Sequence, residues 1–179
     1  METKTIKWAI DPAHSRAGFR VKHLMISNVD GVFNTFSGEV HTTGDDFSTA
    51  EISFRMDASS IDTGMADRDA HLKSPDFFET EKYPEITFTG GRLRDLGDDT
   101  FELTGELTMK GITRQVSLTA EFGGSMKDPW GNTKAGFTVT GKLNRKNWGL
   151  NWNAALEAGG VLVSEEVKLN CDIQLALMA

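Results

Sequence analysis

Apolar and polar residues alternate with a period of two along most of this chain, and this pattern limits the folds open to it. Between Ala50 and Ala58 every second residue is apolar, and the residues between them are Glu, Ser, Arg and Asp. Such a period is typical of antiparallel strands that bury one face and expose the other. It recurs at residues 16–26, 35–42, 86–90, 101–110, 115–122, 135–143 and 167–177. Together these ranges predict eight long strands.

The connections between the strands favour antiparallel neighbours. Leu96–Asp99 and Lys110–Ile112 are short turns that contain glycine, which suits hairpins, and residues 128–132 form a longer turn. The sequence shows none of the helical crossovers that a parallel sheet needs. We therefore expect a single all-β domain that spans residues 1–179.

Residues 67–84 interrupt the alternation, because their apolar residues follow no period of two. Ser74 followed by Pro75 matches a helix start, in which Ser caps the free N–H groups and Pro takes the first helical position. Pro84 limits the other end of this stretch. The stretch predicts one or two short helical turns that begin at Ser74 and link two sets of strands.

Eight amphipathic strands fit either a sandwich or a closed barrel, and closure is favoured because it removes exposed sheet edges. The inward face also carries small residues on nearly every strand, which favours an internal cavity. These residues are Ala17, Gly38, Ala50, Ala58, Gly90, Gly105, Ala120, Ala135 and Gly141. The alternative is that small residues allow close packing and coiling of the strands.

The composition excludes several classes of partner. The formal net charge of −7 and the pI near 5.1 argue against nucleic acid and against electrostatic attachment to anionic membranes. No apolar run has the length of a membrane span, so stable membrane anchoring is not expected. The first residues lack the apolar core of a signal peptide, and the single cysteine, Cys171, cannot form an internal disulfide. We therefore expect a cytoplasmic protein.

No group of residues forms a recognisable catalytic or metal-binding pattern. His23 falls on the inward face, where a lone histidine is usually a packed core residue. His71 lies in the 67–84 stretch without the paired His or Cys spacing of metal sites. Asp11, His14 and Ser15 have the residue types of a hydrolytic triad, but they stand too near in sequence to face one another. A non-enzymatic protein without a metal or cofactor is the expectation.

Eight stretches form a set of motifs in a fixed order along the chain: Trp8–Ser15, Phe19–His23, Gly31–Gly38, Ser59–Thr63, Asp69–Phe78, Tyr83–Phe88, Gly105–Gly111 and Asn144–Gly149. This set resembles the YceI-like family of lipocalin-like barrels. The resemblance implies an extended eight-stranded antiparallel barrel whose apolar tunnel holds a long isoprenoid chain, such as a polyprenyl or isoprenoid quinone tail. It implies no catalytic residues and no cofactor apart from the bound lipid. Many relatives are periplasmic and carry a signal peptide, which this sequence does not show.

The expected function is therefore binding, storage or transport of a long apolar amphiphile. The inward face supplies the predicted tunnel lining: Phe19, Val21, His23, Phe36, Ile52, Phe54, Met56, Phe88, Leu103, Leu107, Leu118, Phe137, Val139, Leu169 and Cys171. The 67–84 stretch supplies the predicted mouth: His71, Leu72, Lys73, Phe77 and Phe78. There the aromatic rings would gate the tunnel, and His71 or Lys73 would face a polar head group.

Three alternatives remain open from the sequence. The ligand could be a fatty acid or fatty amide. The protein could be a lipid-modifying enzyme that uses His23 or His71. It could also be a packed barrel that acts as an interaction module without a ligand. The mass of any apolar molecule that co-purifies with the protein would discriminate between them.

Three tryptophans near the end of the chain favour a homodimer. Trp130, Trp148 and Trp152 fall in predicted loops. Exposed aromatic residues often mark an interface or a ligand portal.

Overall fold

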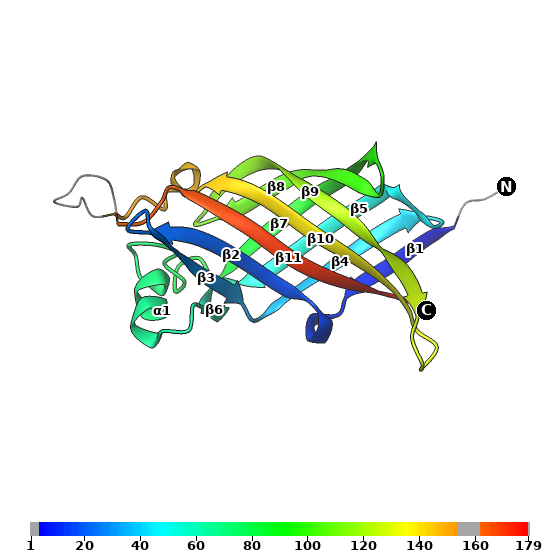
Figure 1. The fold of residues 1–179 in the computed structure, drawn as a ribbon, viewed down its shortest axis with the longest axis horizontal. Coiled ribbons are helices and arrows are strands. Elements are labelled where there is room, and N and C mark those ends of the chain that lie inside the picture. The colour runs from blue at the N-terminus through cyan, green and yellow to red at the C-terminus, as the bar shows by residue number, and fades with distance from the viewer. Residues whose placement is uncertain (1–3, 154–161, 179) are drawn as a thin grey trace.

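The structure is a computed structural model that describes residues 4–153 and 162–178. Figure 1 shows one elongated barrel whose strands run obliquely along its length, with the short helix α1 at one end. The strands are β1 (Thr5–Ile10), β2 (Arg16–His23), β3 (Ser27–Phe33), β4 (Phe36–Thr43), β5 (Asp46–Asp57), β6 (Ile61–Asp62), β7 (Glu85–Gly97), β8 (Thr100–Met109), β9 (Ile112–Lys127), β10 (Thr133–Asn144) and β11 (Glu166–Leu177).

These eleven segments make a closed barrel of eight antiparallel strands, because three of the barrel strands are interrupted. β1 and β2 flank the 3-10 turn η1 (Pro12–His14), and both pair with β11. β4 pairs with β1, and β3 pairs with β2. On their other sides, β4 pairs with β5 and β3 pairs with β6. The remaining strands follow in chain order from β7 to β11. The prediction of an all-β antiparallel barrel is confirmed.

The first half of the chain contains two strand segments that the alternation did not reveal. β1 was not predicted, and residues 16–26 were expected to be one strand, whereas β2 ends at His23 and a tight turn leads into β3. β3 begins Ser-Asn-Val-Asp-Gly, and its polar and glycine residues obscure the period of two. The number of barrel strands is as predicted, but the second is β3 together with β4 rather than residues 35–42 alone.

The helical insert is present, but its helix ends where it was expected to begin. α1 runs from Ala66 to Lys73, and Ser74 closes it by donating from its N–H to the His71 carbonyl at 3.1 Å. Two acidic residues in the first turn and two basic residues in the last turn suit the helix dipole. Pro75 then pushes Ser74 out of the helical region. Within residues 4–153 and 162–178, no helix is long and apolar enough to cross a membrane.

A β-bulge in β7 reverses the side on which one predicted residue lies. The register with β8 shifts between Thr89 and Arg92, and Gly90 adopts a positive φ of 64°. Gly90 is therefore exposed, and Gly91 is buried in its place. The expectation that Gly90 lies on the inward face was wrong, because a bulge adds one residue to the alternation.

The end of the barrel opposite α1 is closed by aromatic side chains. Phe47, at the start of β5, lies 5.4 Å from Trp8, 5.6 Å from Phe122 and 5.0 Å from Phe137, measured between ring centroids. Phe101 contacts Phe137 from the neighbouring region of β8. Among the described residues, the buried Trp8 Nε1 has no hydrogen-bond partner, a cost of about 1–3 kcal/mol that the surrounding ring contacts must offset. We call these five residues the aromatic cluster.

The tryptophans lie in three different environments. Trp130 is exposed in the turn between β9 and β10, as expected. Trp148, in the 3-10 turn η3 (Arg145–Trp148), is buried and donates from Nε1 to the Leu107 carbonyl at 2.9 Å. The expectation that Trp148 is exposed was wrong, because its indole N–H finds a backbone carbonyl as a hydrogen-bond partner inside the fold. Trp152 is half-buried beside His71. The homodimer stays a prediction.

The interruption between β1 and β2 is held by one carboxylate. Asp11 accepts hydrogen bonds from the Ala13 N–H at 3.1 Å, from His14 Nδ1 at 2.9 Å and from Lys134 Nζ at 3.1 Å. The bond from His14 lowers the pKa of the Asp11 carboxyl, partial burial opposes this, and Lys134 on β10 lowers the pKa further. The carboxylate therefore ties η1 across β11 to β10.

We expect Asp11→Asn to lower the free energy of unfolding by about 1 kcal/mol near pH 7, because the amide keeps the cap but loses the charge. The folded-state pKa lies below the unfolded-state value, so this stabilisation is complete above about pH 4 and is lost as the pH falls through the folded-state pKa. Urea denaturation at a series of pH values measures it. Asp45→Asn, in the turn between β4 and β5, is the control. If Asp11→Asn lowered the free energy of unfolding as much in acid as at pH 7, the proposed role of the charge would be contradicted.

Candidate functional site

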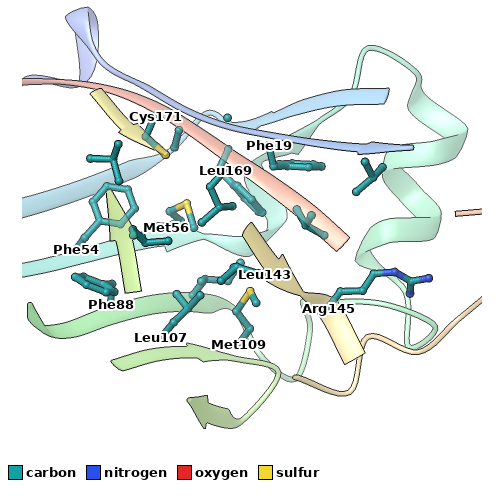
Figure 2. Close-up of a pocket in the computed structure, with 18 of the residues that line it drawn as sticks. Phe19, Phe54, Met56, Phe88, Leu107, Met109, Leu143, Arg145, Leu169 and Cys171 are labelled. Atoms are coloured by element: carbon teal, nitrogen blue, oxygen red, sulfur yellow. The ribbon is translucent and has the colours of Figure 1, made fainter. Parts of the chain in front are cut away.

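The inside of the barrel contains a cavity of about 550 Å³. Its wall is formed mainly by apolar side chains at alternate positions of the strands, because closure turns one face of every strand inward. Figure 2 shows rings and aliphatic chains from several strands converging on this space, with Arg145 at one side of the group. The cavity is therefore a direct product of the alternation.

Most of the residues predicted to bind a ligand lie on the cavity wall. From the predicted tunnel lining these are Phe19, Val21, His23, Ile52, Phe54, Met56, Phe88, Leu103, Leu107, Leu118, Phe137, Val139, Leu169 and Cys171. From the predicted mouth they are His71, Leu72, Phe77 and Phe78.

Phe36 and Lys73 lie off the wall. Phe36 opens β4 directly after the interruption of that strand, and its ring packs 5.8 Å from the ring of Phe54, which does reach the wall. Lys73 is two residues beyond His71 on α1, and residues two apart on a helix do not share a face. The placement of these two residues at the cavity was wrong for these local reasons.

Sequence reasoning missed wall residues that lie outside the regular alternation. Arg145 and Trp152 follow β10 in irregular segments, and Phe33 and Phe47 lie at the end of β3 and the start of β5. No periodic signal marks such positions. The one available signal was that Arg145 falls inside the Asn144–Gly149 motif.

The inward glycines do not open the cavity. A Cβ atom at Gly105 would collide with the ring of Phe88, and one at Gly141 would collide with Leu118. Neighbouring side chains already fill the space that these glycines leave. The alternative interpretation of the small residues, close packing, is correct for these positions, and the cavity lies between the larger side chains.

The cavity opens at the end that carries α1. The wall residues there include the exposed Met65 and Asp67, just before and within α1, and the exposed Lys22 and half-buried His23 at the end of β2. At the other end the wall reaches the aromatic cluster through Phe47. The cavity therefore has one open and one closed end.

Three packed rings, those of His71, Phe77 and Trp152, lie across part of the opening. The ring of His71 meets Trp152 edge-on at 4.6 Å and Phe77 at 5.2 Å, measured between ring centroids. His71 Nε2 lies 2.8 Å from a carboxylate oxygen of Asp76, which fixes the orientation of the imidazole. Phe78 packs on Phe33 from the inner side of the insert. These contacts hold the insert against the barrel.

Arg145 places a buried positive charge on the wall near the opening. Its Nε donates to the Ser164 carbonyl at 2.9 Å, and its terminal nitrogens donate to the carbonyls of Leu150 and Val163. Burial lowers the pKa of this guanidinium, and the Glu165 carboxylate opposes the shift. Arginine remains charged even so. Arg145 therefore joins the two chain segments that border the opening.

The described residues provide no assembled catalytic group. Asp11 and His14 do face each other, but Ser15 Oγ is engaged with the backbone of Gln174 instead of with His14. Burial raises the pKa of the Cys171 thiol, which keeps it protonated and unreactive. Within residues 4–153 and 162–178, no three His, Cys, Asp or Glu side chains gather to hold a metal ion.

Comparison with known proteins places this barrel among related chains. A family model for the YceI-like domain matches residues 8–175. The UPF0312 protein SAS2572 of Staphylococcus aureus (strain MSSA476) is 39% identical over 171 residues, which cover 95% of this chain and 97% of that protein.

Two solved structures share the fold. A YCEI protein of Campylobacter jejuni superposes with a TM-score of 0.76 at 29% identity, covering 88% of this chain and 90% of its own. A polyisoprenoid binding domain from Saccharophagus degradans superposes with a TM-score of 0.64 at 13% identity, covering 96% and 98%. The latter likeness concerns the fold alone.

The packing of Phe88 over Gly105 leads to a stability prediction. We expect Gly105→Ala to lower the free energy of unfolding by about 1–3 kcal/mol, because the ring must leave its rotamer or the strands must shift. Gly123→Ala is the matched control, since its Cβ would make ordinary contacts, and it should change stability by less than about 0.5 kcal/mol. Adding Phe88→Leu to Gly105→Ala should recover part of the loss. If chemical denaturation gave the same free energy of unfolding for Gly105→Ala as for wild type, the prediction would be wrong, and the Phe88 ring would have room to move into the cavity.

Proposed function

Because the chain belongs to the YceI-like family, we propose that its cavity binds one long apolar amphiphile, a polyisoprenoid or an isoprenoid quinone, for storage or transport. The observation that carries this proposal is the apolar cavity of about 550 Å³, closed at one end and open at the other. Small-molecule sites commonly have volumes of about 300–1,000 Å³. A chain-like ligand suits a barrel that is long and narrow (Figure 1).

The binding free energy would come from burial of hydrocarbon. Each buried methylene is worth about 0.8 kcal/mol, but for larger ligands the practical ceiling is nearer 0.3 kcal/mol per atom. We therefore expect dissociation constants between nanomolar and micromolar, with selectivity set by the shape of the wall. An isoprenoid is favoured over a fatty acid or fatty amide by the name of the Saccharophagus degradans domain, which shares this fold.

A binding role is favoured over catalysis by the chemistry of the wall. His23 and His71 are the histidines on it, and His71 Nε2 is engaged with Asp76. In the described part of the chain, neither imidazole is hydrogen-bonded to a Ser, Thr or Cys side chain that could act as a nucleophile. Turnover of a polyprenyl substrate that is lost in His23→Ala or His71→Ala would instead favour the lipid-modifying enzyme.

The first test places a large side chain in the cavity. Val139 lies on the wall directly opposite Cys171 in the β10–β11 ladder, and Thr140 is the next residue, exposed on the outer face. We expect Val139→Trp to weaken binding of a fluorescent prenyl alcohol by about tenfold or more, because the indole takes up ligand space. Thr140→Trp, which adds the same group outside, should bind as wild type does. Equal affinities in both folded variants would show that the probe does not occupy the cavity.

A second test concerns the polar end of the ligand. We propose that the head group lies at the opening near His71 and that Lys73, off the wall, plays no part. A phosphate would gain charge-assisted hydrogen bonds there that an alcohol would not. His71→Gln should therefore reduce the preference for a polyprenyl phosphate over the matching alcohol, and Lys73→Gln on the same helix should leave it unchanged. If wild type binds the phosphate and the alcohol with equal affinity, the insert closes the barrel without recognising the head group.

A further inference from the structure

The turn between β2 and β3 has an unusual sequence for its backbone. Leu24 and Met25 both have positive φ, 55° and 61°, and the Ile26 N–H donates to the His23 carbonyl at 3.2 Å. Two successive residues with positive φ form a hairpin turn that favours Asn and Gly. The other described non-glycine residues with positive φ are all polar: Glu79, Asp98, Asp99 and Lys110. The backbone therefore gives no reason for apolar residues in this turn.

Exposure to water gives no reason for them either. Leu24 is 37% exposed, Met25 50% and Ile26 84%. Three consecutive apolar residues at the tip of a hairpin lose the benefit of burial that such side chains usually gain. A sequence that breaks both the local turn rule and the burial rule at one place marks a functional surface more often than a structural one.

This turn borders the opening of the cavity. His23, immediately before it, lies on the cavity wall, and the Leu24 N–H donates at 2.8 Å to the carbonyl of Leu162, another wall residue. Met65, before α1, is 55% exposed and also lies on the wall. Figure 1 shows the β2–β3 turn and α1 at the same end of the barrel. We call Leu24, Met25, Ile26 and Met65 the lip.

We propose that the lip docks on the surface of a lipid bilayer, so that the ligand passes between bilayer and cavity without crossing water. The proposal rests on the proposed function, since a long apolar amphiphile resides in membranes. The lip is apolar and continuous with the cavity wall, so it would enter the acyl region rather than bind head groups. The net charge of −7 opposes attraction to anionic lipids, so the partner is a neutral bilayer and the contact is weak and reversible.

The first experiment needs no ligand. Binding of the whole protein to sucrose-loaded phosphatidylcholine vesicles is measured by sedimentation for wild type and for the double variant Met25→Ser with Ile26→Ser. The control is Met126→Ser with Trp130→Ser, which removes side chains that are 77% and 84% exposed. Met126 lies near the end of β9 and Trp130 in the β9–β10 turn, which Figure 1 shows at the end of the barrel opposite α1. We expect the lip variant to bind vesicles about tenfold more weakly than wild type and the control to bind as wild type does. Equal binding by both variants, or stronger binding to vesicles rich in phosphatidylserine, would overturn the proposal.

The second experiment follows transfer of a fluorescent geranylgeraniol from phosphatidylcholine vesicles to the protein. Docking predicts a transfer rate that rises with vesicle concentration, because transfer then occurs on contact, and a rate about tenfold lower in the lip variant. Affinity for the same probe added from detergent should not change in that variant. A rate independent of vesicle concentration would overturn docking while leaving cavity binding intact. Absence of probe binding from detergent in wild type would overturn the proposed function instead, and the vesicle sedimentation result would still decide the docking.

Discussion

Closure of the sheet along β11 is the constraint on which the rest of the structure depends. β11 pairs with β1 through Trp8 and Leu177 and with β2 through Arg20 and Lys168, so it bridges the interruption at η1. Once β11 has paired with β1 and β2 along this seam, the sheet has no open edge there. The inward residues of all strands then share one interior. The alternation that each strand shows separately then produces a single apolar space. The Asp11 carboxylate matters because it holds the interruption without breaking the seam.

The two ends of this space differ in chemistry, and the difference gives a bound amphiphile a direction. The closed end consists of the aromatic cluster, in which the one buried indole N–H of Trp8 does not reach the cavity wall. The open end carries Arg68, His71 and Arg145 on its wall. Burying a polar head group without a hydrogen-bond partner costs several kcal/mol, roughly 2–7 depending on the reference state. An amphiphile bound in the cavity would therefore place its tail toward the aromatic cluster and its head group toward the insert.

The sequence correctly predicted the features that follow from the period of two, such as which strand residues face the cavity. It failed where a single residue changes the local backbone or lies outside the strands. Alternation placed residues such as Phe54 and Leu169 on the cavity wall, because the side of a strand residue follows from its parity. It failed at Gly90, where a bulge changes the parity, and at Ser74, whose cap chemistry serves either end of a helix. Arg145 lies outside any period, and its place on the wall follows from carbonyl groups that approach it only in the folded chain.

The strands and the irregular segments also differ in how firmly they are bonded, and this difference indicates where a ligand would enter. The barrel wall is hydrogen-bonded from strand to strand, so separating two strands would break many bonds at once. The start of the insert is also fixed, since the Asp69 carboxylate accepts from the Thr63 N–H at 2.8 Å and from its hydroxyl at 2.6 Å. The part beyond α1 meets the rest of the chain through ring contacts among His71, Phe77 and Trp152 and through a hydrogen bond from Lys110 Nζ to the Pro75 carbonyl at 3.0 Å, which is far less than the bonding between two strands. A chain that entered the cavity would therefore pass beside these rings while the strands stayed paired.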